Sequence, residues 1–386
     1  MRLSKLVFRN AVRSPLRAGM TVLTVAIMLM AFVFPRSLVE AQQAQVRESP
    51  NNRVITQPKV GWGTPLPLRY ADEVRAMDGV KTAVGVQWTG FKVPGKDDVF
   101  FAAFALEPEP FIAMHHELVA PQADKQAFIE DDHGAIVSAD LAKQFGWKLG
   151  GRVVLQSNVA PGEWQLNVSC IYEAVGGEWA KRSIWIHHAY FNRMLPVEQR
   201  DQLSFISAEI FEPNQGGRIA KAIDLHFDTT PARTMSLEDR VQTAANIGRF
   251  SAILTALDVV SYLILLVVLS ILANTLTMNV RERTREFGVL RAIGFGPLHL
   301  CALVAGEAAL LGLSGSLCGV GLSYLLIENL LGPLLKDAFQ LPEVLVPVRV
   351  ALTAVAAGGA LAMLAATLPV LRLARLEVRE TLGRVT

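Results

Sequence analysis

The sequence predicts a membrane protein with four transmembrane helices and one α+β extracytoplasmic domain inserted between the first and second helices. The chain has 386 residues, of which 51% are hydrophobic and 19% charged, whereas about 25% charge is usual for a soluble domain. Four apolar stretches are long enough to cross a bilayer, and arginines are concentrated in alternate segments between them, as expected if those segments lie on one side. Roughly 200 residues of mixed helical and strand pattern follow the first stretch, enough for one large or two small domains.

The four apolar stretches are predicted to be transmembrane helices. A helix needs roughly 20 apolar residues to cross the hydrocarbon core, and residues 16–39, 254–278, 298–327 and 350–371 meet this requirement. The alternative is that these stretches are buried core helices of a soluble protein. Four runs of spanning length make that alternative less favoured. The N-terminus is basic and then apolar, like a signal peptide. Its apolar run is longer than usual, however, and no A-x-A-like cleavage site follows closely, so we expect a retained span.

Basic residues beside the spans predict the orientation of the chain, because lysine and arginine concentrate in cytoplasmic loops. They are Arg2, Lys5, Arg9, Arg13 and Arg17 before the first span, Arg281, Arg283, Arg285 and Arg291 between the second and third, and Arg372, Arg375, Arg379 and Arg384 after the fourth. We therefore expect residues 1–15 (an amphipathic helix), 279–297 and 372–386 to be cytoplasmic. Residues 40–250 and the short loop 328–349 would be extracytoplasmic. The protein would span the inner, cytoplasmic membrane with both termini inside.

The extracytoplasmic segment alternates helical and strand patterns, which predicts an α+β domain. Helices are expected over 68–77, 138–145 and 217–227, and strands over 80–88, 99–106, 153–156, 166–172, 183–187 and 207–211. A polar helix over 240–249 is expected to run into the second span as a continuous stalk.

The polar and aromatic residues of this domain do not predict a metal or catalytic site. Its histidines are His115, His116, His133, His187, His188 and His226. Adjacent residues on a strand point to opposite faces, so the two adjacent pairs are poor chelates, and hydrogen-bonded or solvated histidines are the favoured interpretation. The tryptophans either belong to the core and to partner contacts or line an apolar ligand cleft, and the first is favoured. Cys170 has no second cysteine in this domain with which to form a disulfide.

Known catalytic motifs are absent from the sequence. There is no G-x-x-x-x-G-K-[ST] phosphate loop, no G-x-S-x-G elbow and no H-E-x-x-H helix. Cysteine and histidine spacings typical of zinc are missing, and a net charge of +2 gives no sign of nucleic-acid binding. The chain is therefore predicted not to be an enzyme, and any work that it performs must draw energy from a partner.

The loop after the second span carries the most informative motif. Residues 279–296 read N-V-R-E-R-T-R-E-F-G-V-L-R-A-I-G-F-G, in which Thr284 can cap a short helix and Gly294 can end it. Phe287, Leu290 and Ile293 fall on one side of that helix, and charged side chains lie elsewhere on it. Such an amphipathic helix beneath the membrane is suited to a groove in a soluble subunit. The alternative is a basic loop that only anchors the topology.

The order R-x-R-E-x-G-x-L-R-A-x-G in this loop resembles the FtsX-like/MacB-like family of ABC transporter permeases. Residues 3–18 are similar to the family's entry helix, residues 135–153 to a helix-then-strand signature of its external domain, and residues 369–382 to its C-terminal tail, although Val378 replaces the usual proline. The third span has the family's glutamate followed by glycines. Those residues are Glu307, Gly312, Gly315 and Gly319. The likeness is to a stand-alone permease without a fused ATPase.

The resemblance implies a permease subunit that binds no cofactor itself and works with an ATP-binding cassette ATPase subunit, which binds ATP and Mg. The ATPase-coupling residues would be Arg283, Arg285, Glu286, Phe287, Gly288, Leu290, Arg291 and Gly294. A second permease copy or a paralogue, membrane lipid and a periplasmic adaptor are further implied partners. The expected function is export or extraction of a lipoprotein, peptide or small hydrophobic compound. The alternative is mechanotransmission without transport, which activates a cell-wall hydrolase or reports a ligand.

The polar and small residues of the third span suggest packing roles. Gly315 and Gly319 form a small-x-x-x-small surface that lets helices approach closely. A carboxylate inside an apolar run is costly and usually faces protein, so Glu307 is interpreted as structural rather than as a proton carrier. It would be protonated, reach the cytoplasmic interface, or pair with an arginine of the coupling loop.

Overall fold

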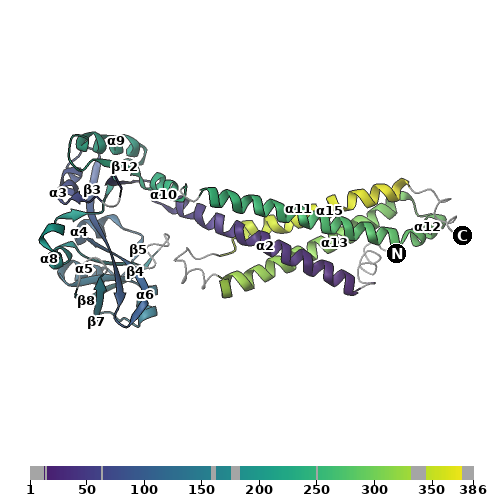
Figure 1. Cartoon of the computed structure of the whole chain (residues 1–386), viewed down its shortest axis with the longest axis horizontal. Helices are drawn as coiled ribbons and strands as arrows, with labels where there is room; N and C mark the ends of the chain where they lie inside the picture. The colour runs from purple at the N-terminus through teal and green to yellow at the C-terminus, as the bar shows by residue number, and fades with distance from the viewer. Residues whose placement is uncertain are drawn as a thin grey trace. The chain divides into compact units, whose positions relative to one another are not determined.

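The computed structural model describes residues 13, 15–61, 64–157, 162–174, 183–248, 251–331 and 345–375. The chain divides into two compact units, one made of Met1–Gln43 with Phe250–Thr386 and the other of Ala44–Arg249 (Figure 1). Most of the amphipathic helix expected over 1–15 lies outside the described residues, as do much of the loop expected over 328–349 and most of the tail expected over 372–386.

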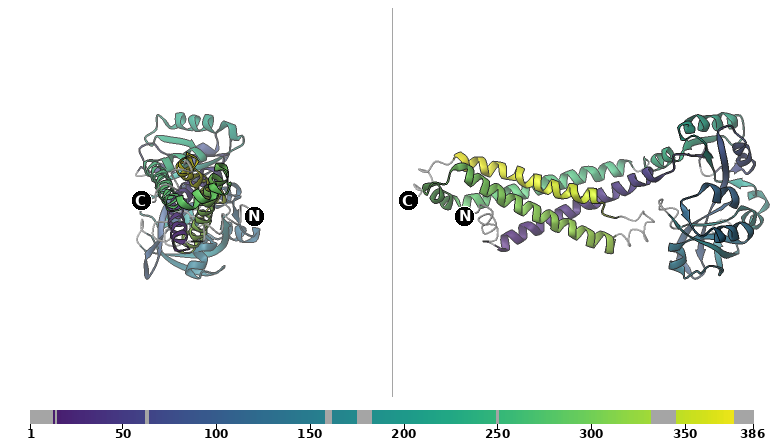
Figure 2. Two further views of the ribbon diagram at one scale, coloured as in Figure 1. Left: turned by 90° about the vertical axis from the view of Figure 1, so that its right-hand side faces the viewer. Right: turned by 180° about the vertical axis from the view of Figure 1, so that it is seen from behind.

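The first unit is helical, and its long helices lie side by side in both views of Figure 2. Its elements are α2 (Pro15–Glu48, whose last residues belong to the second unit), α11 (Ser251–Glu282), α12 (Thr284–Ala292), α13 (Pro297–Ser323), a π-helical continuation η3 (Tyr324–Leu331) and α15 (Val348–Arg375). Among the described residues, four helices are long and apolar enough to cross a membrane, namely α2, α11, α13 with η3, and α15.

The second unit is an α/β domain in which ten of the described strands form one mixed sheet. The sheet order is β12-β1-β11-β3-β4-β9-β6-β8-β5, with β7 paired to β3 and β8. Its strands are β1 (Arg53–Pro58), β3 (Val80–Val93), β4 (Lys96–Leu106), β5 (Leu118–Val119), β6 (Gly134–Ser138), β7 (Arg152–Ser157), β8 (Glu163–Ala174), β9 (Ser183–His187), β11 (Phe205–Ile210) and β12 (Thr234–Glu238). The pairs β4–β9 and β6–β8 are parallel, and the other pairs are antiparallel.

Short elements cover and connect this sheet. They are α3 (Arg69–Arg75), α4 (Pro108–Met114), α5 (Gln122–Glu130), α6 (Ala139–Phe145), α8 (His188–Met194), α9 (Gly216–Phe227), α10 (Asp239–Gly248), the 3₁₀ turns η1 (Val197–Gln199) and η2 (Pro213–Gln215), and a separate pair of strands, β2 (Leu66–Pro67) with β10 (Gln202–Leu203). α6 shows the expected local chemistry, because Ser138 Oγ accepts the amide of Leu141 at 3.3 Å and left-handed Gly146 follows the helix. The continuity expected between α10 and α11 rests on residues 249–250, which lie outside the described residues.

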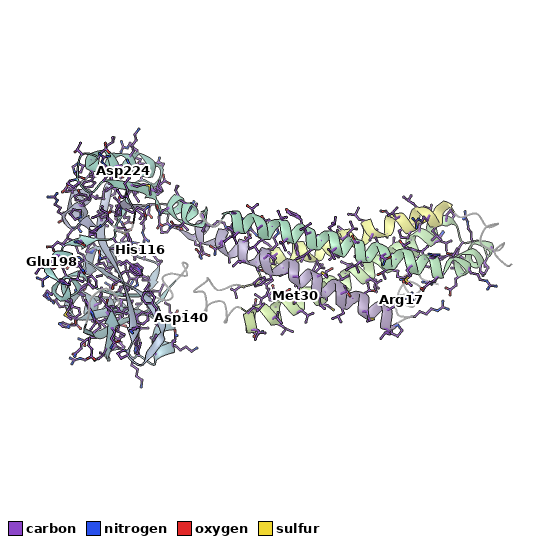
Figure 3. All side chains as sticks on the ribbon, in the orientation of Figure 1. Arg17, Met30, His116, Asp140, Glu198 and Asp224 are labelled. Carbon is purple, nitrogen blue, oxygen red and sulfur yellow. The ribbon has the colours of Figure 1, made fainter. Side chains whose placement is uncertain are left out.

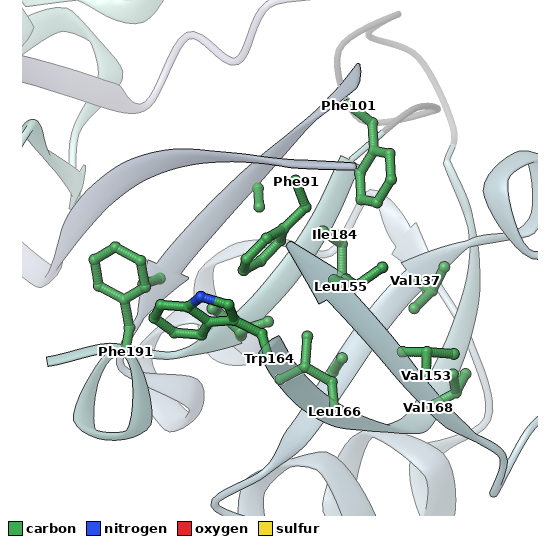
Figure 4. Close-up of a cluster of buried hydrophobic side chains, with 14 of the residues drawn as sticks. Phe91, Phe101, Val137, Val153, Leu155, Trp164, Leu166, Val168, Ile184 and Phe191 are labelled. Atoms are coloured by element: carbon green, nitrogen blue, oxygen red, sulfur yellow. The ribbon is translucent and has the colours of Figure 1, made fainter. Parts of the chain in front are cut away.

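Three apolar clusters stabilise the domain. One packs β1, β11 and α9 around Phe227, the next joins β3, β6, β8 and α4 around Trp185, and the third fills the space between β4, β7, β8 and α8. In the third cluster, the Trp164 ring lies 5.5 Å from that of Phe91 and 5.3 Å from that of Phe191 (Figure 4). Trp164 and Trp185 are therefore core residues, as the favoured interpretation of the tryptophans expects, whereas Trp62 and Trp179 lie outside the described residues.

Four histidines of the domain make hydrogen bonds and ring contacts, namely His115, His133, His187 and His226. His115 Nδ1 lies 3.1 Å from the carbonyl of Phe111, and His187 Nε2 lies 2.6 Å from that of Phe128. Burial lowers the pKa of His115 to about 3, with the charge of Arg53 adding to the effect, so this imidazole is neutral at physiological pH. Cys170 is a buried free thiol, and burial raises its pKa to about 12.

A buried ion pair connects the first strand to a different part of the domain. Arg53 of β1 is 5% exposed, and its guanidinium contacts both oxygens of Glu117 at 2.7 and 2.9 Å. The same guanidinium donates to the carbonyl of Met114, the last residue of α4, at 2.6 Å. Burial opposes ionisation of Glu117, but the hydrogen bonds and charge of Arg53 outweigh it and hold the pKa of the carboxyl below its usual range. The Arg53 guanidinium therefore connects β1 to the end of α4 and to the segment between α4 and β5.

Candidate functional site

The segment predicted to couple to a partner is the helix α12, which follows α11 after a single residue, Arg283. Thr284 does not act as the expected N-cap, because its hydroxyl donates back to the carbonyls of Val280 and Arg281, both at 3.0 Å. It therefore joins α12 to the last turn of α11. Gly294 has φ +105° and follows the helix, and its amide donates to the carbonyl of Arg291 at 3.1 Å. Only glycine adopts this conformation readily, so the sharp end of α12 depends on Gly294.

One face of α12 is buried within the chain itself. Phe287 packs in an apolar cluster with residues of α11, α13 and α15, and Leu290 packs partly against the same cluster. The other members of this cluster are Val280, Leu300, Leu303, Val304 and Leu373. Gly288 is buried as well. The ring of Phe287 thus lies in an apolar cluster of the chain itself, and its expected role in ATPase coupling stays a prediction.

The opposite face of α12 is exposed and combines charge with apolar surface. Arg285, Val289 and Ile293 follow one another at intervals of four residues, which places them on one side of a helix. Val289 is 47% exposed and Ile293 is 72% exposed. The apolar surface that α12 leaves uncovered thus includes Ile293 of the i, i+3, i+6 pattern, but Val289 accompanies it in place of Phe287 and Leu290. Arg291 is half-buried.

Arg283 links α12 to the third long helix. Its guanidinium lies 3.2 Å from Glu286 and 3.4 Å from Glu307 of α13, and its centre lies 5.5 Å from the ring of Phe287. Glu307 is buried. Of the roles proposed for Glu307 from the sequence, pairing with an arginine of the coupling loop is the one that the geometry shows. Removal of either partner would leave the other charge unpaired, so the Arg283–Glu307 contact connects the start of α12 to α13.

Two arginines at the N-terminal end of α2 make further charged contacts, Arg13 just before the helix and Arg17 in its first turn. Arg13 binds both oxygens of Glu286 at 2.8 and 2.9 Å. Arg17, labelled in Figure 3, pairs with Glu282 and donates to Asn279 at 3.1 Å. A single exposed ion pair contributes little to stability, but several charges that share partners in a network contribute more. The beginning of α2, the end of α11 and α12 are thus fastened together at one end of the helical unit.

The glycines of α13 allow helices of the same chain to pack closely. A β-carbon on Gly315 would lie 2.6 Å from Cγ1 of Val25 in α2, and one on Gly319 would lie 2.7 Å from the carbonyl oxygen of Ala26. At Gly312 it would meet Ala362 and the carbonyl of Gly358, both in α15. The small-x-x-x-small surface of α13 therefore serves contacts within one chain.

Comparisons with known proteins match parts of this chain. Residues 259–378 match the family described as FtsX-like permease C-terminal. An uncharacterised ABC transporter permease of Mycobacterium tuberculosis is 27% identical over 210 residues, which are 54% of this chain and 24% of that protein. The ABC transporter permease YtrF of Bacillus subtilis is 41% identical over 51 residues, which are 13% of this chain and 12% of YtrF. The matched regions thus cover a quarter or less of either relative.

Solved structures that resemble the chain include two extracytoplasmic regions of transporters. The periplasmic region of MacB from Actinobacillus actinomycetemcomitans has a TM-score of 0.39 at 9% identity, covering 54% of this chain and 97% of that structure. The extracellular domain of the noncanonical ABC-type transporter YknZ from Gram-positive bacteria has a TM-score of 0.34 at 12% identity, covering 48% of this chain and all of that domain.

The match over residues 259–378 includes α12 and the helices on either side of it. It confirms the resemblance inferred from the loop motif, and the matched relatives are themselves ABC transporter permeases. Residues 259–378 are therefore similar to the FtsX-like permease C-terminal family, and parts of the chain are similar to permeases of ABC transporters.

Proposed function

We propose that this chain is the permease subunit of an ABC transporter and that it converts ATP binding and hydrolysis by a separate ATPase subunit into motion of residues 44–249. In this proposal the four apolar helices span the inner membrane, α12 lies on the cytoplasmic side, and residues 44–249 are extracytoplasmic. Export of a peptide or small hydrophobic compound, extraction of a lipoprotein and activation of a cell-wall hydrolase all need this conversion as their first step.

The observation that carries the proposal is the two-sided character of α12. Its buried face is fixed to α11, α13 and α15 through Phe287. Its charges are tied through Glu286 to Arg13, two residues before α2, and through Arg283 to α13. A force applied to the exposed face would therefore reach all four long helices. Arg285, Val289 and Ile293 on that face offer one charge and two apolar anchors, which suits a groove on a soluble subunit.

Changing the exposed face of α12 is expected to uncouple the permease from its ATPase. Burying Val289 and Ile293 in a groove would contribute about 1.5–3 kcal/mol each, so the double variant Val289→Asp/Ile293→Asp should bind the ATPase at least tenfold more weakly, since about 1.4 kcal/mol corresponds to tenfold. The variant should fold normally because both side chains are exposed. Co-purification with the ATPase and ATP turnover in the reconstituted complex measure the effect.

Two controls separate docking from folding. Val197 is as exposed as Ile293, at 72%, but lies in the other unit, so Val197→Asp should leave ATPase binding unchanged. Phe287→Ala should lower the unfolding temperature instead, because it removes a core side chain. If Val289→Asp/Ile293→Asp binds and stimulates the ATPase like the wild type, α12 is only a topology anchor and the proposed function loses its mechanical link.

A further inference from the structure

The helices α2 and α11 are joined by a second charged contact, far along both helices from the one near α12. Arg36 of α2 pairs with Asp258 of α11, with Nη1 and Oδ1 3.0 Å apart, and both side chains are partly shielded from solvent. The guanidinium also lies 5.9 Å from the ring of Phe32 and 5.2 Å from that of Tyr262. Arg36 is therefore held by a carboxylate and by two aromatic faces, an arrangement that restricts an arginine more than a lone ion pair does.

The two charged contacts bracket the apolar length of the helix pair. Arg17 pairs with Glu282, and Arg36 pairs with Asp258, so the two helices run antiparallel. Between these charges α2 carries no charged residue over 18–35, and over 259–281 α11 carries only Arg281, next to Glu282. The 19 residues from Arg17 to Arg36 span about 28 Å at the helical rise, close to the hydrocarbon thickness of about 30 Å. The contacts thus fall near the two faces of a bilayer.

The backbone of α2 is weakest at the turn that holds the second contact. Pro35 lies inside the helix directly before Arg36, and proline has no amide to bond the carbonyl four residues earlier. Helices bend most readily at such a position. An ion pair one residue later fastens α2 to α11 where the hydrogen-bond ladder of α2 is interrupted. Pairing with α11 therefore compensates for the local loss of stiffness in α2.

We propose that Arg36 and Asp258 are positioning residues that hold α2 and α11 in register at the face of the membrane opposite α12. Together with the Arg17–Glu282 contact they make the two helices one lever, and α2 and α11 are the helices that precede and follow residues 44–249 in the chain. This proposal rests on the proposed function for its consequence, because the lever transmits movement only if α12 receives force from an ATPase. The pairing itself does not depend on that partner.

Exchanging the two charges tests the pairing. Arg36→Asp and Asp258→Arg each place like charges together and should lower the unfolding temperature of the purified full-length chain in lipid nanodiscs, whereas the double exchange should restore most of the loss. ATP turnover of the reconstituted complex, measured well below the unfolding temperature of every variant, should fall in each single variant and recover in the double. The matched control is Arg349→Asp, a charge reversal at an exposed arginine in the first turn of α15, which should change neither value.

The readouts distinguish failure of this proposal from failure of the proposed function. If the single variants match the wild type, or if the double exchange is as impaired as the worse single variant, Arg36 and Asp258 are not a functional pair. If the exchange restores the unfolding temperature but not the ATP turnover, the contact only stabilises the fold and the lever is refuted. If the wild-type chain does not alter the ATP turnover of the ATPase at all, the proposed function fails. The unfolding temperatures alone then show whether Arg36 and Asp258 form a pair.

Discussion

Replacing Arg53 with methionine is expected to destabilise the α/β domain by about 2–3 kcal/mol. Removing one partner of a buried ion pair costs about 3–5 kcal/mol because the other charge is left unpaired, and Glu117 keeps 26% exposure, which reduces the cost. The carbonyl of Met114 also loses its donor. Urea or thermal unfolding of the full-length chain, followed by tryptophan fluorescence, measures the change, since Trp164 and Trp185 lie in the domain core.

Two further variants show whether the pair is the cause. Arg53→Met/Glu117→Met should be more stable than Arg53→Met alone, because no charge is then left without its partner. Arg193→Met breaks an exposed ion pair with Asp132 and should cost less than about 1 kcal/mol. Equal unfolding curves for Arg53→Met and Arg193→Met would show that the buried Arg53–Glu117 ion pair does not stabilise the domain.

Gly319 and Gly321 are expected to respond in opposite directions to alanine. At Gly319 the added β-carbon would lie 2.7 Å from the carbonyl oxygen of Ala26 and 3.1 Å from its Cα. Both are backbone atoms that cannot rotate away, so α13 and α2 must separate, at a cost of about 1–3 kcal/mol. At Gly321, two residues along the same helix, nothing lies within 4 Å, and alanine should be neutral or stabilise the helix by up to about 1 kcal/mol.

Thermal unfolding of the purified chain in lipid nanodiscs compares these two variants directly. Because both substitutions add the same methyl group to the same helix, the difference reports the packing of α13 against α2. A Gly319→Ala variant as stable as Gly321→Ala would mean that the two helices do not approach closely at this point, which would contradict the arrangement of the helical unit.

Regular elements were predictable from the sequence where local chemistry and hydrophobic pattern agree. Ser138 and Gly146 mark the ends of α6, and the apolar pattern of residues 217–227 predicts α9 almost to its bounds. The strand expected over 80–88 continues to Val93, since pairing with β4 persists through Gly90 and Lys92, which interrupt the hydrophobic pattern. Length and composition were equally sufficient to locate the four apolar helices.

Elements that depend on buried polar contacts were missed. β1 contains Arg53 and Thr56, and β12 contains Thr234 and Ser236. Because of these polar residues, neither strand has the apolar pattern typical of a buried strand. In the structure, Thr56 and Ser236 hydroxyls lie 2.9 Å apart, and the carboxylate of Asp224 accepts from Thr234 and Ser236. Thr56 lies 180 residues from Ser236, and Asp224 belongs to a different element from β12, so only the folded chain brings these polar groups together.

The candidate site shows the same division between local and distant information. The loop motif led to α12 and Arg283, because arginine and glycine spacing is visible in the sequence, and the carboxylate inside the third apolar run led to Glu307. The sequence did not show which face of α12 is buried and which is exposed. That depends on Leu300, Leu303 and Leu373 of other helices, which pack against Phe287. Nor could the sequence show that Arg13 reaches Glu286 or that Arg36 reaches Asp258.

The sidedness of the chain is the most direct test of the account, because every proposed step requires α12 and residues 44–249 on opposite sides of the membrane. Lys221 of α9 and Ile293 are both exposed, so single cysteines at these positions, in a chain whose native cysteines are replaced, can react with a membrane-impermeant maleimide. We expect Lys221→Cys to be labelled in intact spheroplasts and Ile293→Cys only after permeabilisation. Labelling of Ile293→Cys in intact spheroplasts, or of Lys221→Cys only after permeabilisation, would contradict the account.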